Sequence, residues 1–179
     1  MRIIGGKLKG LRLNPPKNLP VRPTTDMAKE ALFNILINRY DFEELKVLDL
    51  FSGTGSVSLE FASRGVASVV SVDKASNCAH YLKTTAKSFD LPAIKVYKAD
   101  VFKFLQHETE KFDIIFADAP YDLPQLPTLP KFVFERDLLS SEGVLIVEHP
   151  STIQLDHYPE FTERRKYGYS SFSFFEKKN

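Results

Sequence analysis

One polar turn carries residue types that suit chemistry on an amino group: Asp118, Ala119, Pro120 and Tyr121 follow the apolar segment 112–117. The amino nitrogen of a nucleobase is a poor nucleophile because its lone pair is delocalised into the ring. The Asp118 carboxylate and the Ala119 carbonyl can each accept a hydrogen bond from that amino group, which favours a pyramidal nitrogen with an available lone pair. The Tyr121 ring can stack on a base that leaves its helix. The turn is therefore compatible with group transfer to an exocyclic amino nitrogen, as it is with a plain strand-ending turn.

A second group of residues suits a bound cofactor. The apolar segment 47–51 runs into a turn that contains Gly53 and Gly55, and open α/β sheets bind ligands beyond the carboxyl ends of such strands. The two glycines lack side chains that would block a cofactor close to the backbone. Asp49 can face an ammonium group or a water molecule beside it. The residues that we assign to this cofactor loop are Asp49, Phe51, Ser52, Gly53 and Gly55.

Two further acids end the next two predicted strands. Asp73 ends the segment 69–73, where a carboxylate can accept hydrogen bonds from both hydroxyls of a ribose. Asp100 ends the segment 94–100 and can accept a hydrogen bond from an adenine amino group. Each acid alone is about as frequently a helix N-cap as a ligand, but three acids at three successive strand ends favour a nucleoside site. The neighbouring residues that we add to this site are Lys74 and Val101.

These residues need a sheet that brings strand ends together, and the chain predicts one. Short apolar strands alternate with helical segments, which indicates parallel strands joined by helices in an α/β sheet covered on both faces. A helix is expected over 26–38, after the cap region Thr24-Thr25-Asp26. The last two strands flank Gly168 with no room for a helix and predict an antiparallel pair at one edge. The expected strands span 47–51, 69–73, 94–100, 113–118, 144–148, 161–167 and 169–175.

Two motifs resemble those of known methyltransferases. Asp49 followed by Gly53-Thr54-Gly55 resembles the first motif of S-adenosylmethionine-dependent enzymes, whereas Ser58 stands where a nicotinamide enzyme has a third Gly or Ala. The turn at 118–121 resembles the Asp/Asn-Pro-Pro-Tyr motif of enzymes that methylate amino groups of adenine, cytosine or guanine, with Ala119 replacing the first proline. The order of elements resembles that of class I methyltransferases, which implies a Rossmann-like, mostly parallel seven-stranded sheet with an antiparallel edge strand.

Composition and charge narrow the alternatives. The 179 residues are 43% hydrophobic and 26% charged, as in one globular domain, and no apolar run approaches the length of a membrane span. Cys78 is the single cysteine, and no Cys/His cluster has metal-ligand spacing. We therefore expect a cytoplasmic protein with no metal and no membrane contact. The first 25 residues contain no acid but six basic residues, which predicts a polyanion-binding arm or an ordinary solvated edge: Arg2, Lys7, Lys9, Arg12, Lys17 and Arg22.

Several segments together resemble the RsmD-type family of 16S ribosomal RNA (guanine-N2) methyltransferases. They are 1–7 with Gly10 and Leu13, 22–26, 30–36, and the two motifs above with Tyr167-Gly168. The resemblance implies S-adenosylmethionine as cofactor and a guanine of 16S ribosomal RNA as target, within a 30S particle or an assembly intermediate, and a monomeric enzyme. It divides the chain into a β-hairpin RNA-binding arm over 1–25 and a methyltransferase domain over 26–179. The residues that it assigns to RNA phosphates are Arg2, Lys7, Lys9, Arg12 and Arg22.

Several assignments keep an alternative. The resemblance places Arg22, Thr24 and Thr25 near the methionine end of the cofactor or the substrate entrance, although Thr25 fits a plain helix cap equally well. The basic run 164–166 extends the RNA-binding face or is a solvated strand edge. Asp118 to Tyr121 also fit a plain strand-ending turn. A methyltransferase for another RNA or DNA amino group, such as adenine N6, is the second function considered. A noncatalytic RNA-binding factor in ribosome assembly is the third, with Ala119 as the first sign of lost activity.

Overall fold

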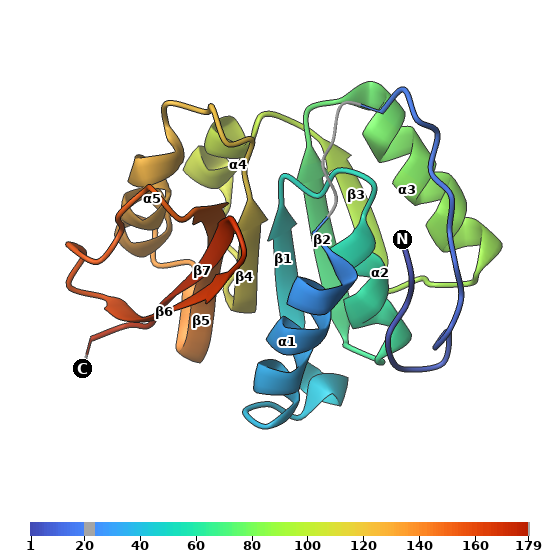
Figure 1. The fold of residues 1–179 in the computed structure, drawn as a ribbon, viewed down its shortest axis with the longest axis horizontal. Helices are drawn as coiled ribbons and strands as arrows, with labels where there is room; N and C mark the ends of the chain where they lie inside the picture. The colour runs from blue at the N-terminus through green and yellow to red at the C-terminus, as the bar shows by residue number, and fades with distance from the viewer. Residues whose placement is uncertain (20–23, 179) are drawn as a thin grey trace.

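The computed structural model describes residues 1–19 and 24–178. Its described strands form one seven-stranded sheet in the order β3-β2-β1-β4-β5-β7-β6, shown in Figure 1. The strands β1 to β5 pair in parallel, and β7 pairs antiparallel with both β5 and β6. The strands are β1 (Lys46–Leu50), β2 (Ser68–Asp73), β3 (Ile94–Lys98), β4 (Phe112–Asp118), β5 (Leu139–Pro150), β6 (Phe161–Tyr167) and β7 (Ser170–Phe175).

This sheet confirms the predicted Rossmann-like plan and corrects two of its details. The antiparallel strand β7 lies between β5 and β6, so the strand at the edge of the sheet is β6, not the antiparallel one. The third strand ends at Lys98 rather than at Asp100, because the Asp100 side chain already caps the helix that follows. The chain order reverses between β1 and β4, and such a switch point is where open α/β sheets bind ligands.

Helices cover both faces of the sheet, as predicted. The helices are α1 (Asp26–Ile37), α2 (Ser56–Ser63), α3 (Ser76–Ser88), α4 (Val101–His107) and α5 (Leu129–Glu135), with short 3₁₀ helices η1 (Phe42–Glu44) and η2 (Leu126–Thr128). Side chains of α1, α2 and α3 pack on one face and those of α4 and α5 on the other. Along β1, Val47 packs into the first cluster and Leu48 into the second, as the two-residue period of a strand requires.

The first helix shows how local signals position an element. Thr25 is its N-cap and accepts a hydrogen bond from the Ala28 N–H at 3.2 Å, and the helix ends at Ile37, one residue before the predicted end. The face that packs on the sheet includes Leu32, Phe33 and Leu36. This face also buries Lys29, which the spacing of apolar residues did not predict.

The N-terminal residues form a paired loop that rests on the domain. Segments 1–3 and 11–13 exchange backbone hydrogen bonds, such as Ile3 N–H to Leu11 O at 2.9 Å, and meet in an isolated antiparallel bridge between Arg2 and Arg12. The predicted hairpin pairing is therefore limited to one bridge, and no regular strand is present in these residues. At its tip the loop packs against the C-terminal end of α2, where the Lys7 N–H donates to Ser63 O at 2.8 Å.

Two expected absences concern the described residues. No helix within 1–19 or 24–178 is long and apolar enough to cross a membrane. Across the same residues, no cluster of three or more His, Cys, Asp or Glu side chains has the arrangement of a metal site.

Candidate active site

A cavity of about 530 Å³ opens at the carboxyl ends of β1, β2 and β4, on the edge where the sequence places its acids. Most predicted site residues line it together, although they come from four separate segments of the chain. Those residues are Asp49, Phe51, Ser52, Gly53, Asp73, Lys74, Asp100, Val101, Asp118, Ala119, Pro120 and Tyr121.

Two predicted cofactor residues lie outside this lining. Gly55 is the N-cap of α2 with φ 86°, and a Cβ built on it would lie 2.3 Å from Leu82 Cδ1, so its role is to let the loop pack against α3. Thr25 is exposed and caps α1, which is the second of its two predicted roles. The adjacent Thr24 lines the cavity instead.

At one end of the cavity, Asp73 fixes the glycine loop to β2. Its Oδ2 accepts a hydrogen bond from the Gly53 N–H at 2.8 Å, and its Oδ1 accepts one from the Ala75 N–H at 2.9 Å. Asp100 lies two residues beyond the end of β3 and accepts a hydrogen bond from the Lys103 N–H at 3.1 Å as the N-cap of α4. Both carboxylates also border the cavity. Each of these side chains can therefore bind the local backbone and line the cavity at the same time.

Asp49 is buried at the base of the cavity and is 1% exposed. Its Oδ2 accepts a hydrogen bond from Ser58 Oγ at 2.5 Å, and Ser58 Oγ also lies 2.7 Å from Ser71 Oγ. Burial raises the pKa of Asp49 to about 7, and the nearby Asp73 charge adds to this shift, whereas the Ser58 hydrogen bond opposes it. A cation in the cavity would favour the ionised form of this carboxyl group.

The loop between Asp49 and α2 has features that fit a bound nucleoside. Phe51 has a left-handed backbone with φ 59°, which costs energy in a bulky residue and is typical of functional loops. Its ring meets Phe102 edge to face with centroids 6.4 Å apart, and both rings border the cavity. The buried Ser52 Oγ has no hydrogen-bond partner among the residues that the structure describes. Rings, carboxylates and an unsatisfied hydroxyl together suit a nucleoside with a cationic tail.

At the other end, the Asp118 turn meets a buried polar group. Thr24 Oγ1 donates a hydrogen bond to Glu148 Oε1 at 2.9 Å and lies 3.4 Å from Asp118 Oδ2. Glu148 is 1% exposed and pairs with Asp118 in the register of β4 and β5. Tyr121 Oη shares a hydrogen bond with Ser170 Oγ at the start of β7. The turn at 118–121 thus lies between Thr24, which precedes α1, and the strands β5 and β7.

Glu148 and Ser170 were missed by the reasoning from sequence. Glu148 follows an apolar run near the carboxyl end of β5, as Asp49 does on β1, so the same signal marks it. Ser170 carries no such signal, because its place beside Tyr121 depends on the antiparallel pairing of β7 with β5.

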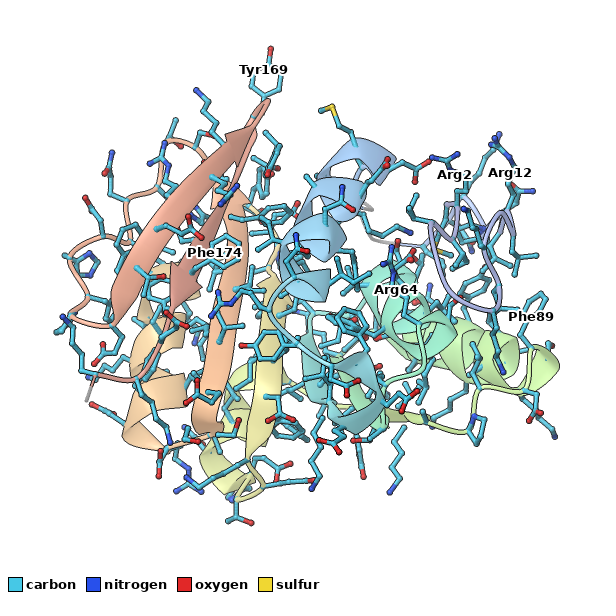
Figure 2. The ribbon with its side chains drawn as sticks, turned by 90° about the horizontal axis from the view of Figure 1, so that it is seen from below. Arg2, Arg12, Arg64, Phe89, Tyr169 and Phe174 are labelled. Carbon is cyan, nitrogen blue, oxygen red and sulfur yellow. The ribbon has the colours of Figure 1, made fainter. Side chains whose placement is uncertain are left out.

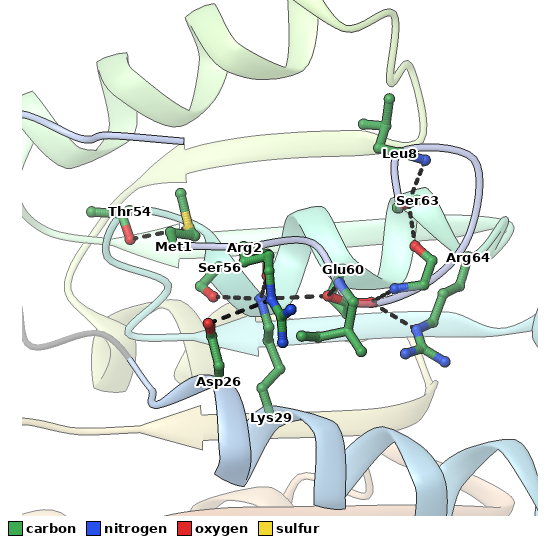
Figure 3. A network of polar contacts seen from close by, with 12 residues as sticks. Met1, Arg2, Leu8, Asp26, Lys29, Thr54, Ser56, Glu60, Ser63 and Arg64 are labelled. Carbon is green, nitrogen blue, oxygen red and sulfur yellow. Dashed lines mark hydrogen bonds and ion pairs between the residues drawn. The ribbon is translucent and has the colours of Figure 1, made fainter. Parts of the chain in front are cut away.

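The N-terminal loop is fastened to the domain by a buried ion pair, shown in Figure 3. Lys29 Nζ lies 3.4 Å from Glu60 Oε1, and it donates hydrogen bonds to Arg2 O at 2.6 Å and to Ser56 Oγ at 3.2 Å. Both side chains of the pair are fully buried. Glu60 in turn accepts hydrogen bonds from the N–H groups of Ile4 and Gly5, each at 2.9 Å, and from Arg64 Nε at 2.8 Å.

This fastening brings the loop next to the cofactor end of the cavity. Ser56 and Thr54 line the cavity, and Thr54 Oγ1 lies 3.9 Å from the Met1 sulfur. The close approach at the tip requires Gly6, which has φ 79° and whose added Cβ would lie 1.9 Å from Ser63 O. The loop is consequently part of the packed structure and not a free arm.

The predicted RNA-binding residues divide into two groups. Lys9 and Arg12 are exposed, and Figure 2 shows Arg12 at the outer side of the loop. Arg2 Nε lies 3.6 Å from Asp26 Oδ2, and Lys7 Nζ donates a hydrogen bond to Asp90 O at 3.1 Å. Arg22 lies outside the described residues.

Comparison with known proteins identifies the family. A family model described as "Conserved hypothetical protein 95" matches residues 1–176. The chain belongs to this family. Its relatives confirm the resemblance to the RsmD-type proteins. A Bacillus subtilis protein named "Putative rRNA methyltransferase YlbH" is 31% identical over 188 residues, which cover 99% of this chain and 100% of that protein.

Two further matches agree with this placement. The "Ribosomal RNA small subunit methyltransferase D" of Escherichia coli K12 is 28% identical over 148 residues, covering 83% of this chain and 74% of that protein. The solved structure named "Putative methyltransferase yhhF from Escherichia coli" is 23% identical with a TM-score of 0.85, and each chain is covered to 99%. This structural similarity confirms the fold of the chain.

Proposed function

We propose that the protein transfers a methyl group from S-adenosylmethionine to the exocyclic N2 amino group of a guanine in 16S ribosomal RNA. The observation that carries this proposal is the single cavity that joins Asp73 and Asp100 at one end to Asp118 and Ala119 at the other. A nucleoside cofactor and a base can meet there. The names of the relatives, which include small-subunit ribosomal RNA methyltransferases, support the choice of RNA.

The residues at the first end fit S-adenosylmethionine, which when bound supplies an electrophilic methyl group on a sulfonium. Asp73 would accept hydrogen bonds from the ribose hydroxyls, and Asp100 would accept one from the adenine amino group. Phe51 and Phe102 would cover the adenine ring with apolar surface. Asp49 has a raised pKa and would face the cationic methionine part, whose charge would favour its ionised form.

Asp118 and Ala119 prepare the amino group of the substrate. The Asp118 carboxylate and the Ala119 carbonyl each accept one hydrogen bond from the guanine N2 amino group. These two hydrogen bonds would hold the nitrogen with its lone pair free to attack the methyl group that the cofactor would supply, with the N–C bond formed as the S–C bond is broken. The nitrogen becomes positively charged, so the Asp118 carboxylate stabilises the developing charge before the proton leaves to water.

Ala119 keeps the part of the motif that this chemistry uses. Its backbone carbonyl is the proposed acceptor, and its side chain is 1% exposed, so a small residue fits the site. Pro120 restricts the residue before it to extended conformations. This restriction on residue 119 is the same whether that residue is alanine or proline, so the turn keeps this part of the motif's conformation.

We place the RNA on the side of the N-terminal loop. Glu60 binds the backbone N–H groups of Ile4 and Gly5 and so fixes the loop. Lys9 and Arg12 are exposed and can bind phosphates of the RNA. Arg2, Lys7 and Arg22 complete this proposed surface, with residues 1–25 as RNA-binding arm and 26–179 as catalytic domain. Binding through phosphates weakens steeply with salt. The target is a 30S particle or an assembly intermediate in the cytoplasm, met by a monomeric enzyme.

A methylation assay tests the proposal against its alternatives. The purified protein is incubated with labelled S-adenosylmethionine and, separately, with 30S particles that lack the modification, naked 16S RNA and duplex DNA. We expect label in guanine of 16S RNA, identified by mass analysis of nucleosides. Label in adenine of DNA alone would overturn the substrate. Tight RNA binding without cofactor binding in calorimetry would favour a noncatalytic assembly factor.

A further inference from the structure

The turn between β6 and β7 presents an aromatic ring to solvent. Tyr169 is 93% exposed, more than any other large hydrophobic side chain of the described residues, and it projects from the hairpin in Figure 2. A single exposed ring is common on protein surfaces. Its position relative to the active site therefore has to decide whether it has a role.

The turn lies at the same edge of the sheet as the cavity, although residues 168–170 do not line the cavity itself. In the antiparallel register, Ser170 pairs with Pro150 at the carboxyl end of β5, so the 168–169 turn reaches the edge of the sheet that holds the active site. Ser170 also shares its hydrogen bond with Tyr121 of the catalytic turn. Tyr169 therefore directly precedes Ser170, the residue that contacts the proposed base-stacking side chain of Tyr121.

The Tyr169 backbone is fixed before any ligand arrives. Gly168 has φ 63° at the first position of a two-residue loop, as type II′ hairpin turns require. The Tyr169 carbonyl accepts a hydrogen bond from the Ser151 N–H at 3.1 Å. The neighbouring Tyr167 ring packs on Phe172 with centroids 5.5 Å apart. An aromatic ring on such a support loses little conformational entropy when it binds.

Basic side chains lie on the strand that leads into this turn. Arg164 and Lys166 are exposed on β6, and they pair in register with Ser173 and Ser171 on β7. In Figure 2, Tyr169 and the Arg2 and Arg12 side chains stand on the same side of the molecule, on either side of α1. Aromatic rings next to cationic side chains are the combination that binds single-stranded nucleic acid.

We propose that Tyr169 stacks on an unpaired nucleotide next to the target base. This inference rests on the RNA substrate of the proposed function. Tyr121 receives the target base inside the cavity, Tyr169 receives its neighbour outside, and Arg164 and Lys166 attract the connecting phosphates. The ring thus selects RNA whose target guanine lies in a single-stranded or opened segment.

Binding of a short RNA tests this role without any need for turnover. The RNA is single-stranded, with one guanine flanked on either side in turn by the fluorescent base 2-aminopurine, whose emission falls when it stacks. We expect Tyr169→Ala to weaken binding on the order of tenfold and to remove the fluorescence quenching at one of the two positions. Tyr169→Phe keeps the ring and restores both. Ile37→Ala, which truncates a 57% exposed side chain at the far end of α1, serves as the control.

Steady-state methylation gives a second readout. Tyr169→Ala is expected to raise KM for the RNA by a similar factor while kcat and the affinity for S-adenosylmethionine stay as in the wild type. Unchanged RNA binding in Tyr169→Ala would overturn the inference, as would an equal loss in Tyr169→Phe. If the wild type transfers no methyl group but the quenching still depends on the ring, the proposed function fails and the stacking site stands. A concentration-dependent dimer that Tyr169→Ala abolishes would instead assign the ring to self-association.

Discussion

Two clusters of ionisable side chains lie near the cofactor loop, and they differ in the charges that they bring together. In the N-terminal cluster, Lys29 and Glu60 neutralise each other, and both Glu60 oxygens accept hydrogen bonds within the protein. In the cavity cluster, several carboxyl groups lie close together: the Asp73 charge adds to the raised pKa of Asp49, and Thr24 Oγ1 contacts both Glu148 and Asp118.

The difference teaches which buried charges hold a fold and which serve a ligand. A charge pair that is saturated by protein groups has no further need of a partner, and removing one member leaves the other unpaired in the interior. Carboxylates that border a cavity, with one pKa displaced to about 7, are arranged to receive a cationic ligand. We therefore expect mutations in the first cluster to change stability and mutations in the second to change activity.

The largest effect should follow the loss of Asp118. Asp118→Ala removes the proposed acceptor for the amino group, so kcat should fall by about 10²–10³-fold while the melting temperature changes little. Radiolabelled methyl transfer to 16S RNA and thermal unfolding measure the two quantities. Asp122→Ala changes an exposed acid four residues along the same turn region and should leave both as in the wild type. Full turnover in Asp118→Ala would remove this residue from the mechanism.

Breaking the other cluster should act on stability. Lys29→Met leaves Glu60 buried without its counter-charge, and we expect a loss of about 3–5 kcal/mol in the free energy of unfolding. The matched control is Lys46→Met, which breaks the exposed pair with Glu110, whose side chains are 52% and 44% exposed. That variant should lose less than about 1 kcal/mol. Equal losses in urea unfolding of the two variants would contradict the assigned difference.

Two adjacent threonines, Thr24 and Thr25, should show the same difference between activity and stability. Thr24→Val removes the hydroxyl that donates to Glu148 beside Asp118, and kcat/KM should fall roughly tenfold, in line with a lost hydrogen bond to a charged group. Thr25→Val removes the α1 cap and should cost about 1 kcal/mol of stability with turnover unaffected. Turnover kinetics and thermal unfolding of both variants would show whether the boundary of the active site runs between them.

The smallest expected effect is a dependence of cofactor affinity on pH. Asp49 has a pKa of about 7 in the folded protein, raised above its unfolded value, so its contribution to stability is present at low pH and is lost as the pH rises through about 7. A cationic cofactor favours the ionised form, so its affinity should rise a fewfold from about pH 6 to 8 with release of a proton. Calorimetry in two buffers of different ionisation enthalpy measures that proton. In Asp49→Asn the affinity should no longer change with pH, and a persistent slope there would point to another group.

Much of the cavity cluster could be predicted from the sequence, because each of its acids is marked by the residues just before it. Asp49, Asp73, Asp100 and Asp118 each follow an apolar run, and parallel strands bring such ends to one edge. The paired N-terminal cluster could not be predicted. Lys29 lies in α1 at a position that the spacing of the apolar residues does not mark, and its partner Glu60 lies in α2. Contacts between residues far apart in sequence leave no periodic pattern, so the docking of the N-terminal loop on α2 became visible only in three dimensions.

The position of β7 has a consequence for the order in which the molecule can be completed. This strand is synthesised after the other six, yet it fills the interior place between β5 and β6 and brings Ser170 to Tyr121. A nascent chain that has left the ribosome only as far as β6 lacks the strand that joins β5 to β6, and its Tyr121 lacks the contact with Ser170. The sheet and the turn at 118–121 are therefore complete only after β7 has left the ribosome.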